Sequence, residues 1–266
     1  MAKCKDIIGF MEKLAPTNLA EDWDNVGLMV GDLEAEVKTI LIALDINDEV
    51  IDEAITKNAD MIITHHPFIF GSIKKINSES AVGRRSIKLI KNGIAVYSAH
   101  TNLDIAKNGT NDVLANLIGI SNRDFLIVTG ENNGLGRVGE LDKPIKFIDF
   151  ARDLKNKLGM KNVTITGDTE KVIKKIGLCT GQGSGSEYMA KAKELGCDAY
   201  ITGDLRYHEA QYANNIDLCV VDITHYESEV LIVPVLCEYL DNCSKQNNFD
   251  FKCLDSEVNA QTLNII

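Results

Sequence analysis

The sequence DMIITHHP at residues 60–67 places an apolar strand directly before two histidines and a proline. Two more apolar runs, VKTILIALD at 37–45 and IAVYS at 94–98, lie on either side of it along the chain. The segments between these runs, Asn47–Lys57 and Ser80–Lys91, have the apolar spacing of helices. Continuous apolar strands that alternate with helices are typical of a parallel sheet covered by helices on both faces.

The alternation resumes in the second half of the chain. Near Phe125–Leu141 the pattern changes to FLIVTG, a Gly-rich turn and RVGEL, which indicates a pair of antiparallel strands. Further helices are predicted at 144–158, 186–195, 206–214 and 227–240, and further strands at 163–166, 173–180, 198–202, 218–222 and 249–253. We therefore predict an α/β protein of two intertwined three-layer lobes. Residues 1–125, completed by 225–266, form the first lobe, and residues 126–224 form the second.

Composition restricts the class of protein. The chain has 266 residues, of which 45% are hydrophobic and 25% charged, so it can bury a core. Its net charge of −11 provides no basic field for nucleic acid, and no run approaches the roughly 18 apolar residues of a membrane span. Its seven cysteines are irregularly spaced without a C-x-x-C motif, which is typical of a reducing compartment. We expect a cytoplasmic protein with no nucleic-acid or membrane partner.

The histidines share one position in this pattern, at or just beyond the carboxyl ends of predicted strands. They are His65, His66, His100, His208 and His225. Ligands bind at that edge of open α/β sheets. Successive side chains of a strand point to opposite faces, so at the strand end before Pro67 the adjacent His65 and His66 can each face a different metal ion. The alternative for this dipeptide is one packed histidine and one at the rim.

Two segments add carboxylates to these histidines. The segment HTNLD at 100–104 ends in Asp104, which is either a metal ligand, a cap for the helix that follows, or a loop residue that accepts hydrogen bonds from backbone amides. The segment HYESE at 225–229 places His225 and Glu229 at i and i+4, on one face of a helix that starts near residue 225. A helix offers two ligands to one metal by this spacing, and the alternative is an ordinary surface pair.

These residues form one set of metal-binding groups. The predicted ligands are His65, His66, Asp104, His225 and Glu229. Three neutral imidazoles and two carboxylates suit zinc, iron(II), manganese, cobalt or nickel, and they argue against calcium or a thiolate site. Five ligands are too many for one closed tetrahedral ion but suit a pair about 3.5–4 Å apart. We predict two divalent metal ions per chain, with zinc or iron favoured.

Three features remain outside this set. His100 could orient a ligand, carry a proton as a catalytic residue, or be structural. His208 could face the same cavity or lie on the surface. The loop TGQGSGS at 180–186 could contact a phosphate through its backbone amides, but it is not a Walker A motif and is a weak signal alone.

The motifs recur together in one known family. They are EDWDNVGLMVGD (21–32), ITHHPFIF (63–70), SAHTNLD (98–104), TGQGSGS (180–186), ITGDLRYHEA (201–210) and DITHYESE (222–229). In this order, over nearly the whole chain, they resemble the NIF-three-like family, whose members are often labelled GTP cyclohydrolase I type 2 homologues. The resemblance implies a metal cleft between two α/β lobes, a dinuclear centre on the same five ligands, and a ring-shaped homohexamer.

Two functional hypotheses follow. The first is a metal-dependent hydrolase of a nucleotide-type substrate, such as GTP opened at its imidazole ring, with a nucleotide or phosphate as ligand and His100 as proton carrier. The alternative is a non-catalytic metal-binding, storage or regulatory scaffold protein, which predicts closed coordination and no adjoining pocket.

Overall fold

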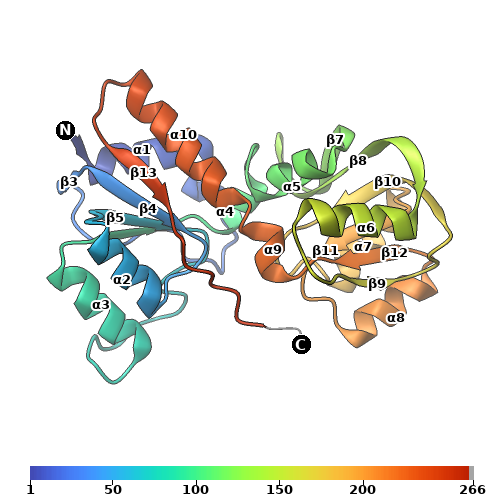
Figure 1. Cartoon of the computed structure of the whole chain (residues 1–266), viewed down its shortest axis with the longest axis horizontal. Helices are drawn as coiled ribbons and strands as arrows, with labels where there is room; N and C mark the ends of the chain where they lie inside the picture. Colours follow the sequence, from blue (N-terminus) through green and yellow to red (C-terminus); the bar gives the residue numbers. More distant parts are fainter. Residues whose placement is uncertain (264–266) are drawn as a thin grey trace. The chain divides into compact units, whose positions relative to one another are not determined.

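The computed structural model describes residues 1–263 and divides into two α/β units (Figure 1). The first contains Met1–Ala106 and Ile232–Thr262, and the second contains Lys107–Leu231. The prediction of an α/β fold with two lobes is confirmed. The chain first enters the second unit after Ala106 rather than after residue 125, because the segment that follows Ala106 packs on and pairs with the second sheet. The first lobe is completed from Ile232 rather than from residue 225 as predicted, because residues 225–231 pack with the second unit. The predicted range 225–266 also includes 264–266, which lie outside the described residues.

The first unit is built on a five-stranded sheet. Its strand order is β13 (Lys252–Asp255), β4 (Thr39–Ala43), β5 (Met61–Thr64), β6 (Ala95–Ser98) and β2 (Gly27–Val30). The first four strands are parallel and β2 runs antiparallel to β6. A two-stranded sheet of β1 (Ala2–Lys3) and β3 (Glu36–Val37) and the short helix η1 (Thr17–Leu19) complete the strands and turns of this unit.

Helices cover both faces of this sheet. They are α1 (Cys4–Leu14) and α10 (Ile232–Gln246) on one face, and α2 (Asp48–Thr56) and α3 (Ala81–Lys91) on the other (Figure 1). Leu41 and Ile62 pack in the core beneath α2 and α3, whereas the alternating Ile40 and Ile63 point to the opposite face. Because all four are fully buried, these strands read as continuous apolar runs.

The two helices predicted between the strands of this unit each begin with a side-chain cap. The Asn47 side chain accepts from the Val50 amide at 2.8 Å, and the Ser80 hydroxyl accepts from the Gly83 amide at 3.0 Å. The short helix α4 (Thr101–Ile105) follows β6 directly.

The second unit has a six-stranded sheet. Its strand order is β7 (Ser121–Gly130), β8 (Asn133–Lys146), β10 (Val172–Leu178), β11 (Ala199–Thr202), β12 (Cys219–Asp222) and β9 (Thr164–Thr166). The middle strands β10, β11 and β12 are parallel, and the predicted antiparallel pair is β7 with β8. Helices α5 (Thr110–Ile118) and α6 (Phe147–Lys157) pack in one core of this unit, and α7 (Ser186–Glu194) and α8 (Tyr207–Asn215) pack in another.

Some element boundaries differ from the predictions. Helix α6 begins at Phe147 rather than Pro144, because β8 continues as far as Lys146 in its pairing with β10. The helix predicted at 227–240 is two helices, α9 (His225–Glu229) and α10. Pro234 has no amide hydrogen to donate, which a new helix tolerates in its first turn but a continuous helix does not. Strand β13 lies slightly beyond the predicted 249–253, and β2 was not predicted.

Within residues 1–263, none of the helices is both long enough and apolar enough to cross a membrane.

Candidate metal centre

Three histidines of the first unit meet at the carboxyl ends of two neighbouring strands. His65 and His66 follow β5, and His100 follows β6, whose register with β5 aligns Thr64 with Ser98. One ring nitrogen from each of the three lies within 4.8 Å of the others. The ring centroids are 5.1 to 5.7 Å apart. This histidine cluster (His65, His66 and His100) therefore has the residue types and spacing to hold a metal ion.

The Nδ1 atom of each ring in the histidine cluster contacts an oxygen. Nδ1 of His65 lies 2.9 Å from the Ala99 carbonyl. Nδ1 of His66 lies 2.8 Å from Asp45, and Nδ1 of His100 lies 2.9 Å from Asp24. A carbonyl or ionised carboxylate can only accept, so Nδ1 carries the proton in the neutral ring and Nε2 keeps the lone pair for a ligand. The oxygens that contact Nδ1 thus select the tautomer that leaves Nε2 for a metal ion.

The contacts of Asp24 keep its carboxyl ionised beside His100. Its side chain is buried, and it also accepts from the amide and hydroxyl of Thr101 at 3.0 and 2.5 Å. Burial raises the pKa of the Asp24 carboxyl, but hydrogen bonds from His100 and Thr101 outweigh it and hold the pKa well below its usual range.

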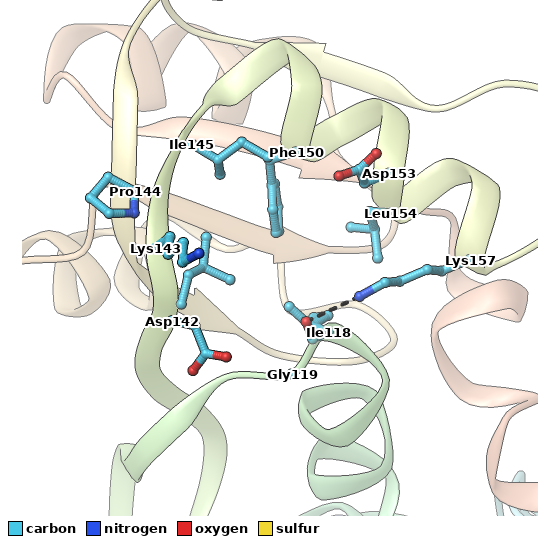
Figure 2. A pocket seen from close by; sticks show the side chains of 11 residues that line it. Ile118, Gly119, Asp142, Lys143, Pro144, Ile145, Phe150, Asp153, Leu154 and Lys157 are labelled. Atoms are coloured by element: carbon cyan, nitrogen blue, oxygen red, sulfur yellow. Dashed lines mark hydrogen bonds between the residues drawn. The ribbon is translucent and has the colours of Figure 1, made fainter.

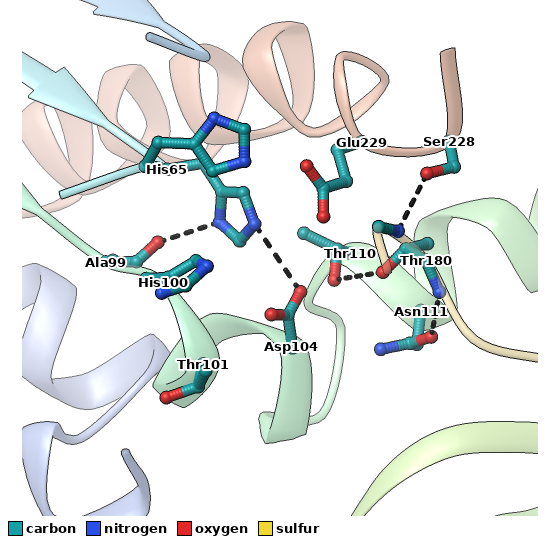
Figure 3. Close-up of polar contacts among 12 residues, drawn as sticks. His65, Ala99, His100, Thr101, Asp104, Thr110, Asn111, Thr180, Ser228 and Glu229 are labelled. Carbon is teal, nitrogen blue, oxygen red and sulfur yellow. Dashed lines mark hydrogen bonds and ion pairs between the residues drawn. The ribbon is translucent and has the colours of Figure 1, made fainter. Parts of the chain in front are cut away.

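Asp104 is the predicted carboxylate ligand of the first unit. It lies in α4, only 8% exposed, with Oδ1 3.6 Å from Nε2 of His65 (Figure 3). The alternative role as a helix cap is wrong, because the N-cap residue is His100 in α4 and Gly109 in the following helix α5. A buried carboxylate on the Nε2 side of His65 suits a shared metal ligand.

The second unit presents an imidazole and a carboxylate from α9. His225 opens the helix, as predicted, and its Nε2 lies 3.1 Å from Oε2 of Glu229. Nδ1 of His225 lies 2.8 Å from Asp204, so this ring has the same Nδ1 arrangement as His66 and His100. Glu229 is only 3% exposed. The oriented imidazole and the buried carboxylate of Glu229 distinguish this i,i+4 pair from an ordinary surface pair.

Backbone conformation holds α9 in place. Thr224, the N-cap residue, has φ 64° and ψ 160°, a combination that is strained for a residue with a β-branched side chain. Asp222 holds the turn by accepting from the amides of Thr224 at 2.7 Å and Leu205 at 3.0 Å. Burial raises the pKa of this carboxyl, partly offset by the two amides. One carboxylate thus joins the loop of Asp204 to the start of α9.

The Gly-rich loop at 180–186 packs on the same helix. Gly181 donates to the Ser228 hydroxyl at 2.8 Å, and the neighbouring Thr180 contacts Thr110 and Asn111 (Figure 3). A Cβ on Gly181 would overlap Oε1 of Glu229 and lie 3.5 Å from Nε2 of His225. The glycine therefore makes room for the Glu229 carboxylate.

The start of α7, where the loop could have contacted a phosphate, faces one of the chain's own carboxylates. An added Cβ on Gly185, the N-cap residue, would lie 2.5 Å from Oε1 of Glu187. A carboxylate near a helix N-terminus offsets the dipole that would attract a phosphate. This weakens the case for the phosphate contact considered from the sequence.

His208 and a separate cavity contribute no comparable chemistry. His208 is exposed on α8, where it contacts Gln211 at 3.2 Å and the ring of Tyr207. A cavity of about 450 Å³ lies beside α6, with Phe150 on its wall and Lys157 bonded to the Ile118 carbonyl (Figure 2). The residues that line it include no histidine or cysteine.

Sequence reasoning missed the carboxylates behind the imidazoles. Asp45 ends the run VKTILIALD, and Asp204 follows the strand AYIT, so both stand at strand ends like the histidines. That position was a usable signal. Asp24 lies in a loop far from any predicted strand end, and only its contact with His100 identifies it.

Comparisons with known proteins agree with this architecture. A protein of Clostridium perfringens called "GTP cyclohydrolase 1 type 2 homolog" is 40% identical over 257 residues, covering 96% of each chain. The crystal structure of a Bacillus cereus protein related to NIF3 superposes with a TM-score of 0.93 at 26% identity, covering 100% of this chain and 99% of that one. Reduced HcgD from Methanocaldococcus jannaschii superposes with a TM-score of 0.81 at 34% identity, covering 97% and 98%.

The family model named Duf34/NIF3 (NGG1p interacting factor 3) matches residues 2–261, which include every histidine and carboxylate described above. The order of the sequence motifs, the two α/β units and the match over nearly the full length lead to one conclusion: the chain belongs to the DUF34/NIF3 family.

Proposed function

We propose that this protein binds two divalent metal ions per chain and uses them to hydrolyse a nucleotide-type substrate. The proposed ligands are His65, His66, Asp104, His225 and Glu229. The observation that carries the proposal is the state of the imidazoles. Each of the three has its Nδ1 beside an oxygen acceptor, at 2.8 or 2.9 Å, which leaves Nε2 to coordinate.

The chemistry of the ligand set supports a transition metal. Three imidazoles and two carboxylates suit zinc, iron, manganese, cobalt or nickel, and zinc or iron are favoured. Two contacts between these groups, 3.1 Å for His225 with Glu229 and 3.6 Å for His65 with Asp104, are within the range that a shared cation can bridge.

The reaction class rests on what such ions supply. Two neighbouring divalent ions act as Lewis acids and activate water at neutral pH. The relatives from Clostridium perfringens and Clostridium acetobutylicum carry the name "GTP cyclohydrolase 1 type 2 homolog". A nucleotide such as GTP, opened at its imidazole ring, is the concrete substrate that this name suggests.

His100 is the proposed proton carrier. Its Nδ1 is oriented by the buried, ionised Asp24, which fixes the ring and leaves Nε2 as the nitrogen that would exchange a proton. The ring is 17% exposed, so a proton can leave it for solvent. His100 also lies within the histidine cluster, so the test must separate a ligand from a proton carrier.

Metal content tests the site. The protein is purified after growth with zinc or iron, and metal per chain is measured by mass spectrometry. We expect about two ions per chain in the wild type and a clear loss in Glu229→Gln. His208→Gln, which changes an exposed histidine, serves as the control and should retain the metal. Fewer than one ion per chain in metal-replete wild type would contradict the dinuclear proposal.

Turnover tests the reaction. A panel of nucleotides and phosphoesters is assayed with wild type, Glu229→Gln and His100→Gln. We expect His100→Gln to keep its metal but to lose turnover. Metal without turnover of any nucleotide in the wild type would favour the alternative, a non-catalytic metal-binding or regulatory scaffold. Activity that Glu229→Gln leaves unchanged would identify a contaminant.

A further inference from the structure

Two exposed aromatic side chains lie beside the histidine cluster. Trp23 and Phe70 are each 59% exposed, and their ring centroids are 6.0 Å apart with an interplanar angle of 48°. Single exposed apolar residues are normal on protein surfaces. Two large rings in contact with each other and with a candidate site are a different feature, which we call the aromatic pair.

The loops that carry the aromatic pair are fixed to each other and to the cluster. Asp24, next to Trp23, binds His100 and Thr101. Asn25 donates from its side-chain amide to the carbonyl of Ile69, next to Phe70, at 2.6 Å. The backbone on both sides is thus held by hydrogen bonds while the two rings remain open to solvent. This is how binding residues are prepared before a ligand arrives.

The pair also contacts the imidazole proposed to carry the proton. The His100 ring centroid lies 6.0 Å from that of Trp23 and 6.5 Å from that of Phe70, in edge-on arrangements. The same imidazole lies 5.2 Å from His65 and 5.7 Å from His66. A ring held on the pair would therefore be one imidazole away from the metal-binding histidines.

The geometry limits how a ligand ring could be held. A ring sandwiched between the two would need their centroids about 7 Å apart, twice the contact distance of about 3.5 Å. The observed 6.0 Å and the tilt leave no such slot. A planar ring can instead stack on the open face of one aromatic ring and meet the edge of the other, which is a favourable arrangement for π systems.

We propose that Trp23 and Phe70 form the subsite for a planar heteroaromatic ring, such as a nucleobase, on the substrate of the histidine cluster. The inference rests on the proposed function, because it assigns the ring of that substrate to a place beside the same imidazoles. Glu21 and Asp22 precede Trp23 in the chain, and their negative charge disfavours a phosphate at this end. The aromatic ring is therefore the part of a nucleotide that the pair selects.

The sole tryptophan of the chain makes the test direct. Metal-loaded full-length protein is excited at a wavelength selective for tryptophan and titrated with guanosine, adenosine or cytidine, and separately with ribose 5-phosphate or inorganic triphosphate. We expect saturable quenching by the ring compounds only. Calorimetry on the same samples gives Kd independently of fluorescence.

Matched variants locate the subsite. Phe70→Ala should weaken nucleoside binding about tenfold, a typical loss for one stacking contact. Tyr207→Ala removes another exposed aromatic that contacts a histidine, His208, and should leave Kd unchanged. Metal content should be that of the wild type in both variants, because neither residue is a proposed ligand.

The outcomes separate this inference from the proposed function. Normal metal content with no quenching and no heat from any nucleoside would overturn the subsite and leave the metal site intact. Fewer than one metal ion per chain in the wild type, together with normal nucleoside binding, would overturn the metal proposal alone. A fall in molecular mass on Phe70→Ala, measured by sedimentation, would mean that a second copy of the chain covers the pair, and it would also overturn the subsite.

Discussion

Nδ1 of His66 and Oδ1 of Asp45 lie 2.8 Å apart, at the carboxyl ends of the adjacent parallel strands β5 and β4. Asp45 side-chain exposure is 40%, so the carboxylate is accessible and its replacement removes little buried surface. The main effect of this replacement is on the orientation of the His66 imidazole. Replacing Asp45 therefore tests metal affinity with little effect on the stability of the fold.

Replacing Asp45 by alanine should lower metal affinity by about 10- to 100-fold, because His66 loses the acceptor that fixes its tautomer and orientation. Competition with a chromogenic chelator measures the affinity. Asp52→Ala is the matched control, since Asp52 is also an accessible acidic residue of this unit, paired with Lys88. Equal affinities in the two variants would show that Asp45 has no part in metal binding.

Gly181→Ala should impair the metal site through Glu229. Gly159→Ala provides the comparison, because both glycines have left-handed φ, 62° and 66°, but a Cβ on Gly159 meets nothing within 4 Å. The backbone cost of about 1–2 kcal/mol is therefore common to both. Only Gly181→Ala should displace the Glu229 carboxylate and reduce metal content. Thermal unfolding and metal analysis of the pair check this, and full metal content in Gly181→Ala would refute it.

Thr224 should tolerate glycine better than alanine. Alanine would keep the strained backbone of this position and lose the hydroxyl that accepts from the Glu227 amide at 3.4 Å. Glycine loses the same cap but adopts φ 64° without strain. We expect Thr224→Gly to be about 1–2 kcal/mol more stable than Thr224→Ala in denaturant unfolding. The reverse order would mean that the backbone at this position is not strained.

A buried ion pair in the second unit should make stability depend on acidity. Asp112 accepts two bonds from the 2%-exposed Arg137, at 2.8 and 2.9 Å. Burial raises the pKa of Asp112, but the guanidinium outweighs it and the net pKa is lowered. A lowered folded-state pKa means that this stabilisation is complete above the ordinary carboxyl pKa of about 4 and is lost as pH falls through the folded value.

Asp112→Ala should cost about 3–5 kcal/mol at neutral pH, since it leaves Arg137 buried without this partner. The difference from wild type should shrink below about pH 4, where the carboxyl takes up a proton in the unfolded chain before it does so in the folded one. Denaturant unfolding between pH 7 and 3 measures it. Glu194→Ala, which removes an exposed partner of Lys191, should change little at any pH. A difference that stays constant down to pH 3 would argue against the assigned pKa direction.

Much of the fold could be predicted because its signals are local. The strands β4 and β5 are buried on both faces, so their apolar runs are continuous. Asn47 and Ser80 cap α2 and α3, the helices predicted between the strands. The break between α9 and α10 and the edge strand β2 were missed. Pro234 was a local signal for the break that went unused, whereas β2 depends on its pairing with β6 more than on its own periodicity.

The candidate site divides in the same way. The pairing of His225 with Glu229 is a matter of helical spacing, and His65, His66 and His100 mark strand ends, so the sequence alone determined which residues to consider. The ring-shaped hexamer implied by the family resemblance stays a prediction.

Only the tertiary structure decided what lies behind those residues. Asp24 reaches His100 across 76 positions of the chain, and Gly181 approaches Glu229 from a loop on another strand. The physical reason is range. Periodicity, caps and i,i+4 spacing follow from a few consecutive backbone angles, whereas a hydrogen bond between distant residues depends on the path of every element between them.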